Sequence, residues 1–361
     1  MNSLEKVFSF VWVASFLFIA PHLYADKLDS VAEKARNATG KENITCSLNG
    51  DSKDVIAISK ATGELKKQTV LNIIPDNYST RIYFLKNDDL IIESSPDLMS
   101  KFDKNSRGTG NTDKDNDCER EKTFDNFNYK GKLPCPPVFL DLQGQDDIVR
   151  NFNGYLRVHQ SVTIVDSVLI RLSVMPENSR TEINLVNSIV FSLICTGSKA
   201  RNGSLNINMK NCTVVSYCDE RSPLYLCGLI NMNISNSILF SPGDLFLVTL
   251  PKKKLNLKDS VLSGRKSLCV LLGNDQKNKG KSFTDMKSLK KVMSISCDKN
   301  TVVADPMFEE DPDLDLNLTI CPISSLKLKD ASPAKKLNAG VNLSEENFPV
   351  PPGKEKAKQG E

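Results

Sequence analysis

The segment Val162-Thr-Ile-Val-Asp166-Ser167-Val-Leu-Ile170 contains the pattern that decides the fold. Apolar residues alternate with other residues, Asp or Asn follows, Ser or Cys comes next, and a second apolar run ends the unit. Four further copies occupy 183–191, 207–215, 232–240 and 255–263. The Asn or Asp positions, 166, 187, 211, 236 and 259, are separated by 21, 24, 25 and 23 residues. A period in this range indicates one supersecondary unit per repeat.

Each repeat has the character of short β-strands rather than of helices. Alternation with a period of two and enrichment in β-branched residues favour strands, and Gly, Pro, Asn and Ser separate the copies. A leucine-rich repeat would need its own Leu spacing and a helix in each unit, and the sequence has neither. We therefore predict an all-β fold, a parallel β-helix solenoid whose successive coils stack about 4.8 Å apart.

This stacking gives each column of equivalent residues a role. Side chains four and two positions before the Asn or Asp are expected to face inward, each contributing about 1.5–3 kcal/mol by burial. The Asn or Asp occupies the bend, where it can adopt an unusual backbone angle and bond to neighbouring coils. Cys212 stands where the other copies have Ser and is expected to be a small packed residue. The column three positions before the bend faces outward: Thr163, Asn184, Asn208, Asn233, Asn256.

The C-terminal part of the chain contains two further motifs. One is Ala304-Asp305-Pro306-Met-Phe308, and the other is Ser332-Pro333-Ala334 followed by Ala339-Gly340. They are similar to the "ADPLF … SPAIDAG" close of many secreted bacterial proteins described as choice-of-anchor or right-handed β-helix domains, although Lys335-Lys336 replaces the usual apolar-acidic pair. From about 163 to 340 the chain resembles the right-handed parallel β-helix proteins of the pectin-lyase-like superfamily. The resemblance implies a right-handed single-stranded β-helix and export, and its members range from lyases to proteins of unknown role.

The N-terminus has the features of an export signal. A 14-residue apolar run, Val7–Ala20, precedes a small residue, Ala25, at the expected cleavage point. The run suits a signal peptide over 1–25 better than an uncleaved anchor, because a membrane-spanning helix needs about 20 residues. We therefore predict a secreted, periplasmic or cell-surface protein that keeps no transmembrane anchor after cleavage.

The remaining chain divides by composition. Residues 26–99 are expected to hold an N-terminal cap and early irregular coils, and the capping box Ser30-Val-Ala-Glu33 predicts a short helix that plugs the open end of the solenoid. Residues 100–137 are polar and form a predicted insertion loop. The β-helix domain and its closing segment are assigned to 138–345, and a disordered tail to 346–361.

Charge and cysteine content limit the partners and the redox state. Lys and Arg number 47 against 44 Asp and Glu in 361 residues, and this balance gives no sign of a nucleic-acid partner. Ten cysteines in an exported chain favour disulfides. Cys195 with Cys218 is the first expected pair, because the two are predicted to lie about one coil apart. Cys118 with Cys135 and Cys297 with Cys321 follow, and the alternative is that several are buried free thiols.

Catalytic and metal signals are few. Glycosidases need two carboxylates facing one bond, yet fifteen outward positions of the repeats include a single carboxylate, Glu182. Lys210, Lys258 and Arg157 are the candidates for the base and clamp of a lyase. His159 is the one histidine left after signal removal, which excludes metal sites that need several histidines, and we expect it on the surface.

A calcium site in the insertion loop is the only cofactor that the sequence suggests. Asp113, Asp115 and Asp117 resemble the start of a calcium loop, but Cys118 and Phe124 stand where Gly and Glu are required. We therefore predict a solvated acidic loop and no cofactor, with weak calcium binding as the alternative.

The leading functional hypothesis is a non-catalytic exported protein. Its polar outward column is suited to binding an extended glycan or another cell-envelope component, or the protein has a structural role. The alternative is a polysaccharide lyase or glycoside hydrolase that uses a groove built by the insertion loop.

Overall fold

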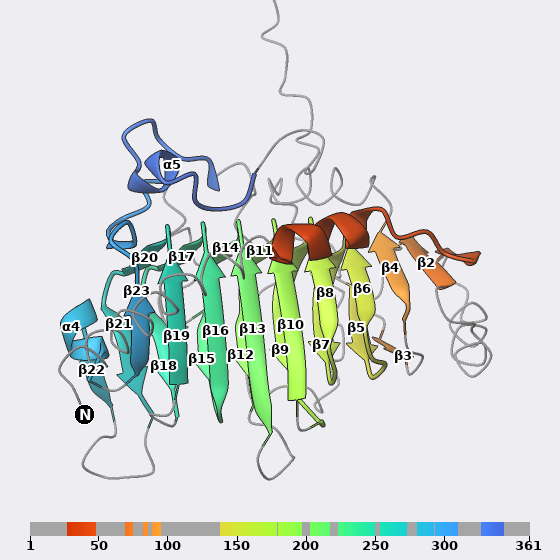
Figure 1. Ribbon diagram of the computed structural model, residues 1–361, viewed down its shortest axis with the longest axis horizontal. Helices are drawn as coiled ribbons and strands as arrows, with labels where there is room; N and C mark the ends of the chain where they lie inside the picture. Colours follow the sequence, from red (N-terminus) through yellow and green to blue (C-terminus); the bar gives the residue numbers. More distant parts are fainter. Residues whose placement is uncertain are drawn as a thin grey trace, which may run out of the picture.

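The computed structural model describes residues 27–47, 69–74, 82–85, 89–94, 138–178, 180–196, 203–216, 223–249, 253–272, 280–291, 293–309 and 326–342 (Figure 1). These residues form an all-β fold with few helices, as predicted. The predicted insertion loop 100–137, the predicted signal peptide 1–25 and the predicted tail 346–361 lie outside the described residues. Within the described residues, no helix is long and apolar enough to cross a membrane.

Two large sheets contain the described strands. The ten strands of sheet A pair in parallel throughout. In their spatial order they are β1 (Glu42–Ser47), β2 (Thr69–Ile74), β4 (Ile91–Ser94), β6 (Asp147–Arg150), β8 (Val162–Val165), β10 (Arg180–Val186), β13 (Ser204–Lys210), β16 (Ile230–Ser235), β19 (Lys253–Lys258) and β23 (Ser294–Cys297).

Sheet B has fourteen described strands and is parallel except for β22, which pairs antiparallel with β21. Its strands are β3 (Ile82–Leu85), β5 (Val138–Leu142), β7 (Asn153–Val158), β9 (Val168–Val174), β11 (Ile189–Val190), β12 (Leu193–Cys195), β14 (Thr213–Val215), β15 (Leu224–Leu226), β17 (Ile238–Ser241), β18 (Asp244–Val248), β20 (Val261–Gly264), β21 (Ser267–Leu271), β22 (Lys281–Phe283) and β24 (Val302–Val303).

The chain passes from one sheet to the other at the predicted Asn and Asp positions. Their φ angles lie between 45° and 52°, the left-handed region that Asn and Asp tolerate better than other non-glycine residues. The positions are Asp166, Asn187, Asn211, Asn236 and Asp259. Each therefore turns the chain between a strand of sheet A and the following strand of sheet B.

The register between repeats is the predicted one. Ile183 pairs with Val162 on one side and Ile207 on the other, and Met232 continues the row to Leu255. These side chains and the second inward column are buried in one hydrophobic cluster. Residues about two dozen apart in sequence are thus packing neighbours, and the described core runs from Leu90, beside β4, to Met293, beside β23.

A hydrogen-bonded column follows the bends. Ser167, Ser188, Ser237 and Ser260 are fully buried, and each hydroxyl donates to the carbonyl oxygen two residues earlier at 2.7–2.9 Å. Cys212 occupies the same column and its thiol donates to the carbonyl oxygen of Lys210 at 3.3 Å. Burial raises the pKa of this thiol to about 12. The expectation of a small packed residue is confirmed.

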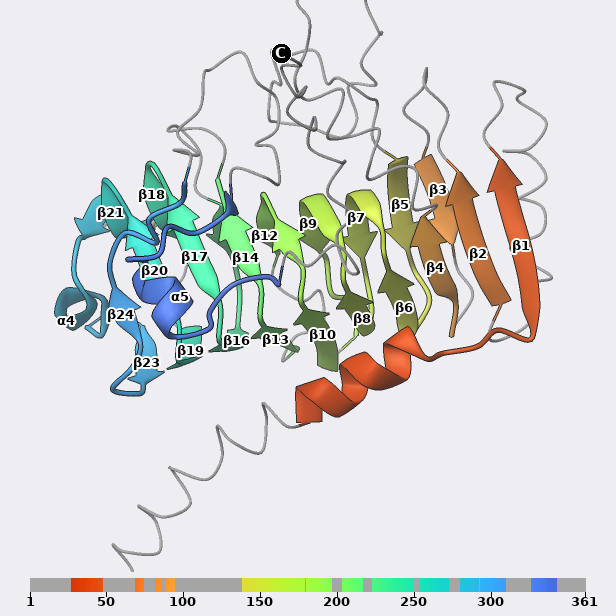
Figure 2. The same ribbon diagram turned by 90° about the horizontal axis from the view of Figure 1, so that it is seen from above.

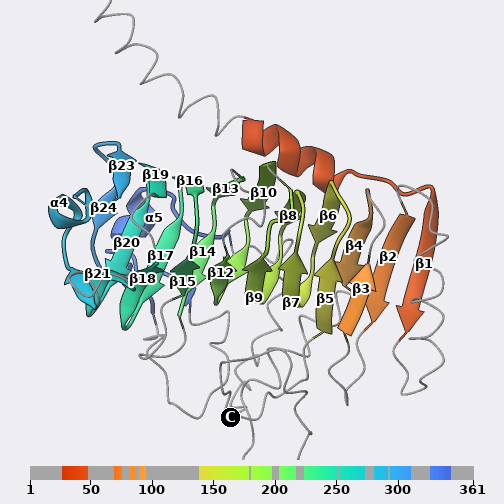
Figure 3. The same cartoon turned by 90° about the horizontal axis from the view of Figure 1, so that it is seen from below.

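The N-terminal helix, residues 27–36, is not an end cap. It lies along the outer side of sheet A, beside β6, β8, β10 and β13, whereas β1 ends the sheet (Figures 2 and 3). Residues 27–36 are all helical, so Ser30 lies inside the helix and not at its N-cap. Leu28, Ala32 and Ala35 form one apolar stripe that packs on outward valines of β8 and β10. The apolar stripe is buried against the outer face of sheet A and not against the open end of the core. The prediction that the helix plugs the end is therefore wrong.

The C-terminal segment covers the outer side of sheet B. Helix α4 (Met286–Leu289) lies at the end of the molecule beside β21 and β22, with Leu289 fully buried. Helix α5 (Pro333–Lys336) begins at Ser332, whose side chain accepts from two backbone N–H groups. The ring of Phe308 meets Phe240 edge to face, with centroids 5.6 Å apart. The closing motifs therefore pack as a second layer on the sheet.

Candidate functional site

The outward column of sheet A forms a continuous ladder of amides. Asn208 donates from Nδ2 to Oδ1 of Asn184 at 2.9 Å, Asn233 donates to Asn208 at 2.8 Å, and Asn256 donates to Asn233 at 2.7 Å. Thr163 pairs in register with Asn184 and begins the row. The predicted column is thus assembled by strand register, and we call it the amide ladder.

The side chains of the amide ladder use part of their hydrogen-bonding capacity on one another. An asparagine amide has two N–H donors and an oxygen with two lone pairs, so one ladder bond on each side leaves Asn184, Asn233 and Asn256 further capacity, whereas Asn208 uses both of its N–H donors. Asn208 is 2% exposed and also donates to Glu182 at 3.0 Å. A parallel column is joined by Asn231 donating to Asn206 at 3.0 Å. The face therefore offers a flat row of amides that repeats at the strand spacing, about 4.8 Å.

The N-terminal helix flanks the amide ladder. It covers Val165 and Val186, one position before the bend, and Asp29 of the helix forms an ion pair with Lys210 in the same column. Lys258 lies further along that column, on β19. Lys210, one of the candidate bases, is thus an anchor of the helix.

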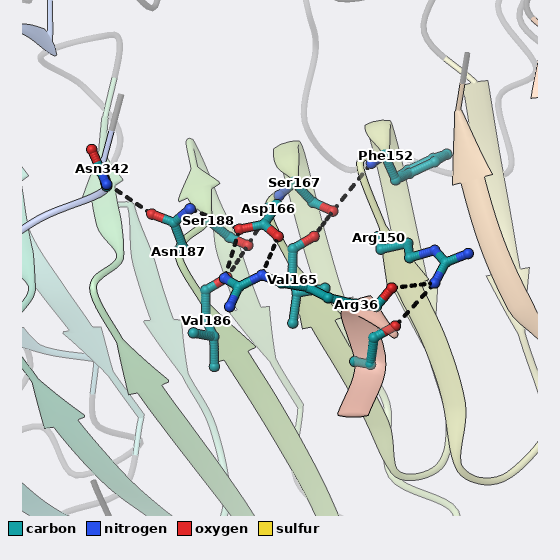
Figure 4. A network of polar contacts seen from close by, with 11 residues as sticks. Arg36, Arg150, Phe152, Val165, Asp166, Ser167, Val186, Asn187, Ser188 and Asn342 are labelled. Carbon is teal, nitrogen blue, oxygen red and sulfur yellow. Dashed lines mark hydrogen bonds and ion pairs between the residues drawn. The ribbon is translucent and has the colours of Figure 1, made fainter. Parts of the chain in front are cut away.

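A network of charges and amides connects both terminal segments to the bend column (Figure 4). Arg36 of the helix donates twice to Asp166, at 2.6 and 2.8 Å, and Asn187 donates to the same carboxylate at 2.7 Å. The hydrogen bond to Asp166 raises the pKa of Arg36 above its ordinary value. From the other side, the backbone N–H of Asn342 donates to Oδ1 of Asn187 at 2.8 Å. A chain of hydrogen bonds therefore connects Arg36 to Asn342 through Asp166 and Asn187.

Arg150 also fixes the C-terminal end of the helix. Its Nη1 donates to the carbonyl oxygens of Ala35, Arg36 and Ala38 at 3.2, 2.7 and 2.9 Å, which satisfies carbonyls that a helix C-terminus leaves unpaired. Its Nε pairs with Glu93 at 2.7 Å. These contacts involve Arg and Glu residues that lie outside the five repeat copies, so the repeat pattern gave no sign of them.

A second polar cluster, which we call the His159 cluster, lies at the β5–β7–β9 end of sheet B. Asp141 and Arg157 are neighbours in register and lie 3.3 Å apart. His159 Nε2 is 3.0 Å from Asp141 Oδ1, and its Nδ1 is 3.4 Å from Glu177 Oε1. Neither imidazole contact has hydrogen-bond geometry. Each counts as an ion pair only with a protonated ring.

The His159 cluster corrects the prediction that His159 is a surface residue, and it shows where the candidate Arg157 lies. His159 is 9% exposed and not a surface residue, because the strands on either side enclose it. The candidate Arg157 contacts a nearly buried carboxylate here, whereas Lys210 and Lys258 lie on sheet A, so the three candidates do not share a site. Asp141 was missed because β5 carries no copy of the repeat; its one signal is a charge between two core leucines, Leu140 and Leu142.

Five cysteines of the described residues are free thiols: Cys195, Cys212, Cys227, Cys269 and Cys297. Cys195 and Cys297 are unpaired, and their expected partners, Cys218 and Cys321, lie outside the described residues, as do Cys118 and Cys135. The residue stacked on Cys195 in the next strand is Leu226, because the chain between β14 and β15 is longer than the repeat spacing suggested. Burial raises the pKa of the Cys195 thiol well above its ordinary value.

No metal centre is found in the part of the chain that the structure describes, where no three His, Cys, Asp or Glu side chains are placed to hold an ion. Asp113, Asp115 and Asp117 lie outside that part. Comparison with known proteins adds no assignment: no protein-family model matches the chain, and no curated protein matches it significantly.

Proposed function

We propose that the chain is an exported, non-catalytic, right-handed parallel β-helix protein of the pectin-lyase-like superfamily that binds an extended polysaccharide of the cell envelope on the amide ladder. The solenoid is supported by strands that alternate between two parallel sheets, by bends at a spacing of about two dozen residues, and by unbroken register across the repeats. Export is supported by the apolar run Val7–Ala20. A secreted, periplasmic or cell-surface location follows from it.

The observation that carries the binding proposal is the ladder itself. Its asparagines lie on four successive strands, in register and hydrogen-bonded to one another. Amides that hold one another in place present their remaining donors and acceptors in a fixed row, so little side-chain entropy is lost when a polymer binds. The same face holds one carboxylate, Glu182, in the fifteen outward repeat positions. Binding without turnover fits this chemistry better than acid–base cleavage does.

A glycan array followed by titration tests the proposal. The substitution Asn233→Ala with Asn256→Ala removes two outer members of the ladder and is expected to weaken binding of the selected glycan about tenfold or more, since each lost hydrogen bond contributes about 0.5–1.5 kcal/mol. Asn300→Ala, which alters an amide outside the ladder, is the matched control and should bind like the wild type. Equal affinity of both variants for the glycan would refute the ladder as the binding site.

The His159 cluster favours a second candidate, a polysaccharide lyase or glycoside hydrolase. An imidazole beside a carboxylate is suited to proton transfer, and an adjacent Arg can bind an acidic sugar. Incubation of the purified protein with acidic polysaccharides should then give unsaturated or hydrolysed products, and His159→Gln should abolish them. Products that disappear in this variant would replace the binding proposal; no product in either protein keeps it.

A further inference from the structure

The near-neutral net charge conceals a strong asymmetry along the chain. Residues 252–299 contain 13 Lys and Arg against 4 Asp and Glu, whereas the rest contains 34 against 40. One seventh of the sequence thus carries an excess of nine positive charges, and the remainder is acidic. Such a concentration of one sign creates a local field that attracts a counter-charged partner.

The fold gathers this segment at one end of the molecule. Strands β19 to β23 and helix α4 form the end opposite β1 (Figure 1). We call it the basic end, and define it by the seven exposed lysines among its described residues: Lys254, Lys266, Lys281, Lys287, Lys290, Lys291, Lys299.

The carboxylates described at the basic end are already bonded within the protein. Asp285 accepts the backbone N–H of Ser288 at 2.7 Å as the N-cap of α4. Asp298 accepts from the backbone and hydroxyl of Thr301 at 2.9 and 2.6 Å, and Asp259 accepts from Asn300 at 2.7 Å. Within the described part of the chain, no carboxylate forms an ion pair with Lys254, Lys287 or Lys290. These three charges are therefore available to an external anion.

The lysines stand on a rigid support with hydroxyl groups beside them. Leu289 of α4 is fully buried in the core, which holds the helix in place. Ser294 and Ser296 of β23 are exposed and lie in register with Lys254 and Asn256 of β19. Charges and neutral donors thus alternate over two adjacent strands, an arrangement that suits a chain of anionic groups better than a single ion.

We propose that the basic end is a docking surface for a linear phosphate-bearing polymer. Twelve of the thirteen cations of 252–299 are Lys and one is Arg. An ammonium group is a point charge that contacts phosphate oxygens from any direction, whereas Arg recognises carboxylate and phosphate alike through paired donors. Among the described residues of this segment only Leu272 is an exposed large apolar side chain, too little for a surface that inserts into a lipid bilayer. This surface adjoins the amide ladder on β19, where Lys254 and Asn256 lie on one strand, but its proposed ligand is a phosphate-bearing polymer and not the ladder's glycan.

Titration with inorganic polyphosphate at several salt concentrations tests the proposal. The triple variant Lys254→Gln, Lys287→Gln, Lys290→Gln should bind about tenfold or more weakly, and the slope of log affinity against log salt should fall by about 2, at about 0.7 per lost contact. The control variant Lys34→Gln, Lys327→Gln, Lys336→Gln removes three exposed charges elsewhere and should keep the wild-type slope. Both variants should melt like the wild type, since all six side chains are exposed.

Three outcomes would overturn the proposal. The first is no salt-sensitive binding of polyphosphate by the wild type. The second is an equal loss in both triple variants, which would indicate a net-charge effect and not a surface. The third is tighter binding to anionic lipid vesicles, or to a polyuronate, than to polyphosphate at equal charge concentration. Glycan binding by the triple variant is a separate readout, because no ladder asparagine is changed.

Discussion

Ser237 shows how one small polar residue serves two neighbouring coils of the chain. Its hydroxyl donates to the carbonyl oxygen of Ser235 and accepts the backbone N–H of Cys212 at 3.1 Å, all in the buried interior. Ser237→Ala leaves that N–H without a partner, so we expect the free energy of unfolding in urea to fall by about 1–3 kcal/mol. Ser294→Ala, on the exposed face of β23, is the control, and an equally small change in both variants would contradict the role of the column.

Lys253 carries an ammonium group that is buried in the fold. It is 3% exposed, donates from Nζ to the carbonyl oxygen of Gly228, and burial lowers its pKa despite the nearby thiols of Cys227 and Cys195. Between this lowered pKa and the ordinary value of about 10.4, the unfolded chain binds more protons than the folded one. Stability from this group therefore rises with pH in that window.

Lys253→Met tests this dependence, because methionine keeps the apolar stem and removes the charge. We expect the free energy of unfolding of the wild type, minus that of the variant, to increase as the pH rises toward 10.4. The measurement is urea denaturation at a series of pH values. Lys254→Met, an exposed neighbour, should give a flat difference, and a flat difference for both would show that Lys253 is hydrated in the folded state.

At the scale of elements, the N-terminal helix is held by a few specific side chains. Arg36 contacts a carboxylate that is only 7% exposed, although Arg36 itself is 41% exposed. Arg36→Ala leaves Asp166 with Asn187 as its bonded partner here, so we expect a loss of about 1–3 kcal/mol, below the 3–5 of a fully buried pair. Amide exchange in residues 27–36 should become faster, whereas Lys34→Ala should leave it unchanged. Unchanged exchange in Arg36→Ala would assign the docking to the apolar stripe alone.

The elements that could be predicted are those that the repeat encodes locally. Inward and outward columns follow from alternation, and the bend follows from Asn or Asp, so β8 to β20 and the amide ladder were predictable. Asn151 makes the same left-handed bend, φ 50°, yet it lies only 15 residues before Asp166 and lacks the pattern. The place of the helix depends on Arg150 and Asp166, which no local pattern connects to residues 27–36. The His159 cluster likewise depends on register between strands that carry no repeat copy.

At the scale of the whole molecule, the two ends of the sheets differ. Among the described residues, the N-terminal helix lies beside β6 to β13 and not at the β1 end, whereas at the other end α4 inserts Leu289 into the core cluster and carries Lys287 of the basic end. Because the core is a continuous stack, the last coil is stabilised on one side by its neighbour and on the other by this cap. Loss of the packing of α4 should therefore also destabilise the neighbouring strands.

Leu289→Ala tests the cap. The side chain is fully buried, so we expect the free energy of unfolding to fall by about 2–5 kcal/mol through lost burial and the cavity left behind. Leu229→Ala makes the same chemical change at a residue that is 49% exposed, and it should cost well under half as much. Amide exchange should accelerate first in β21 and β23 and last in β8, because each coil is coupled mainly to its neighbours. Uniform acceleration along both sheets would instead indicate a single cooperative unit, in which the end coil has no stability of its own.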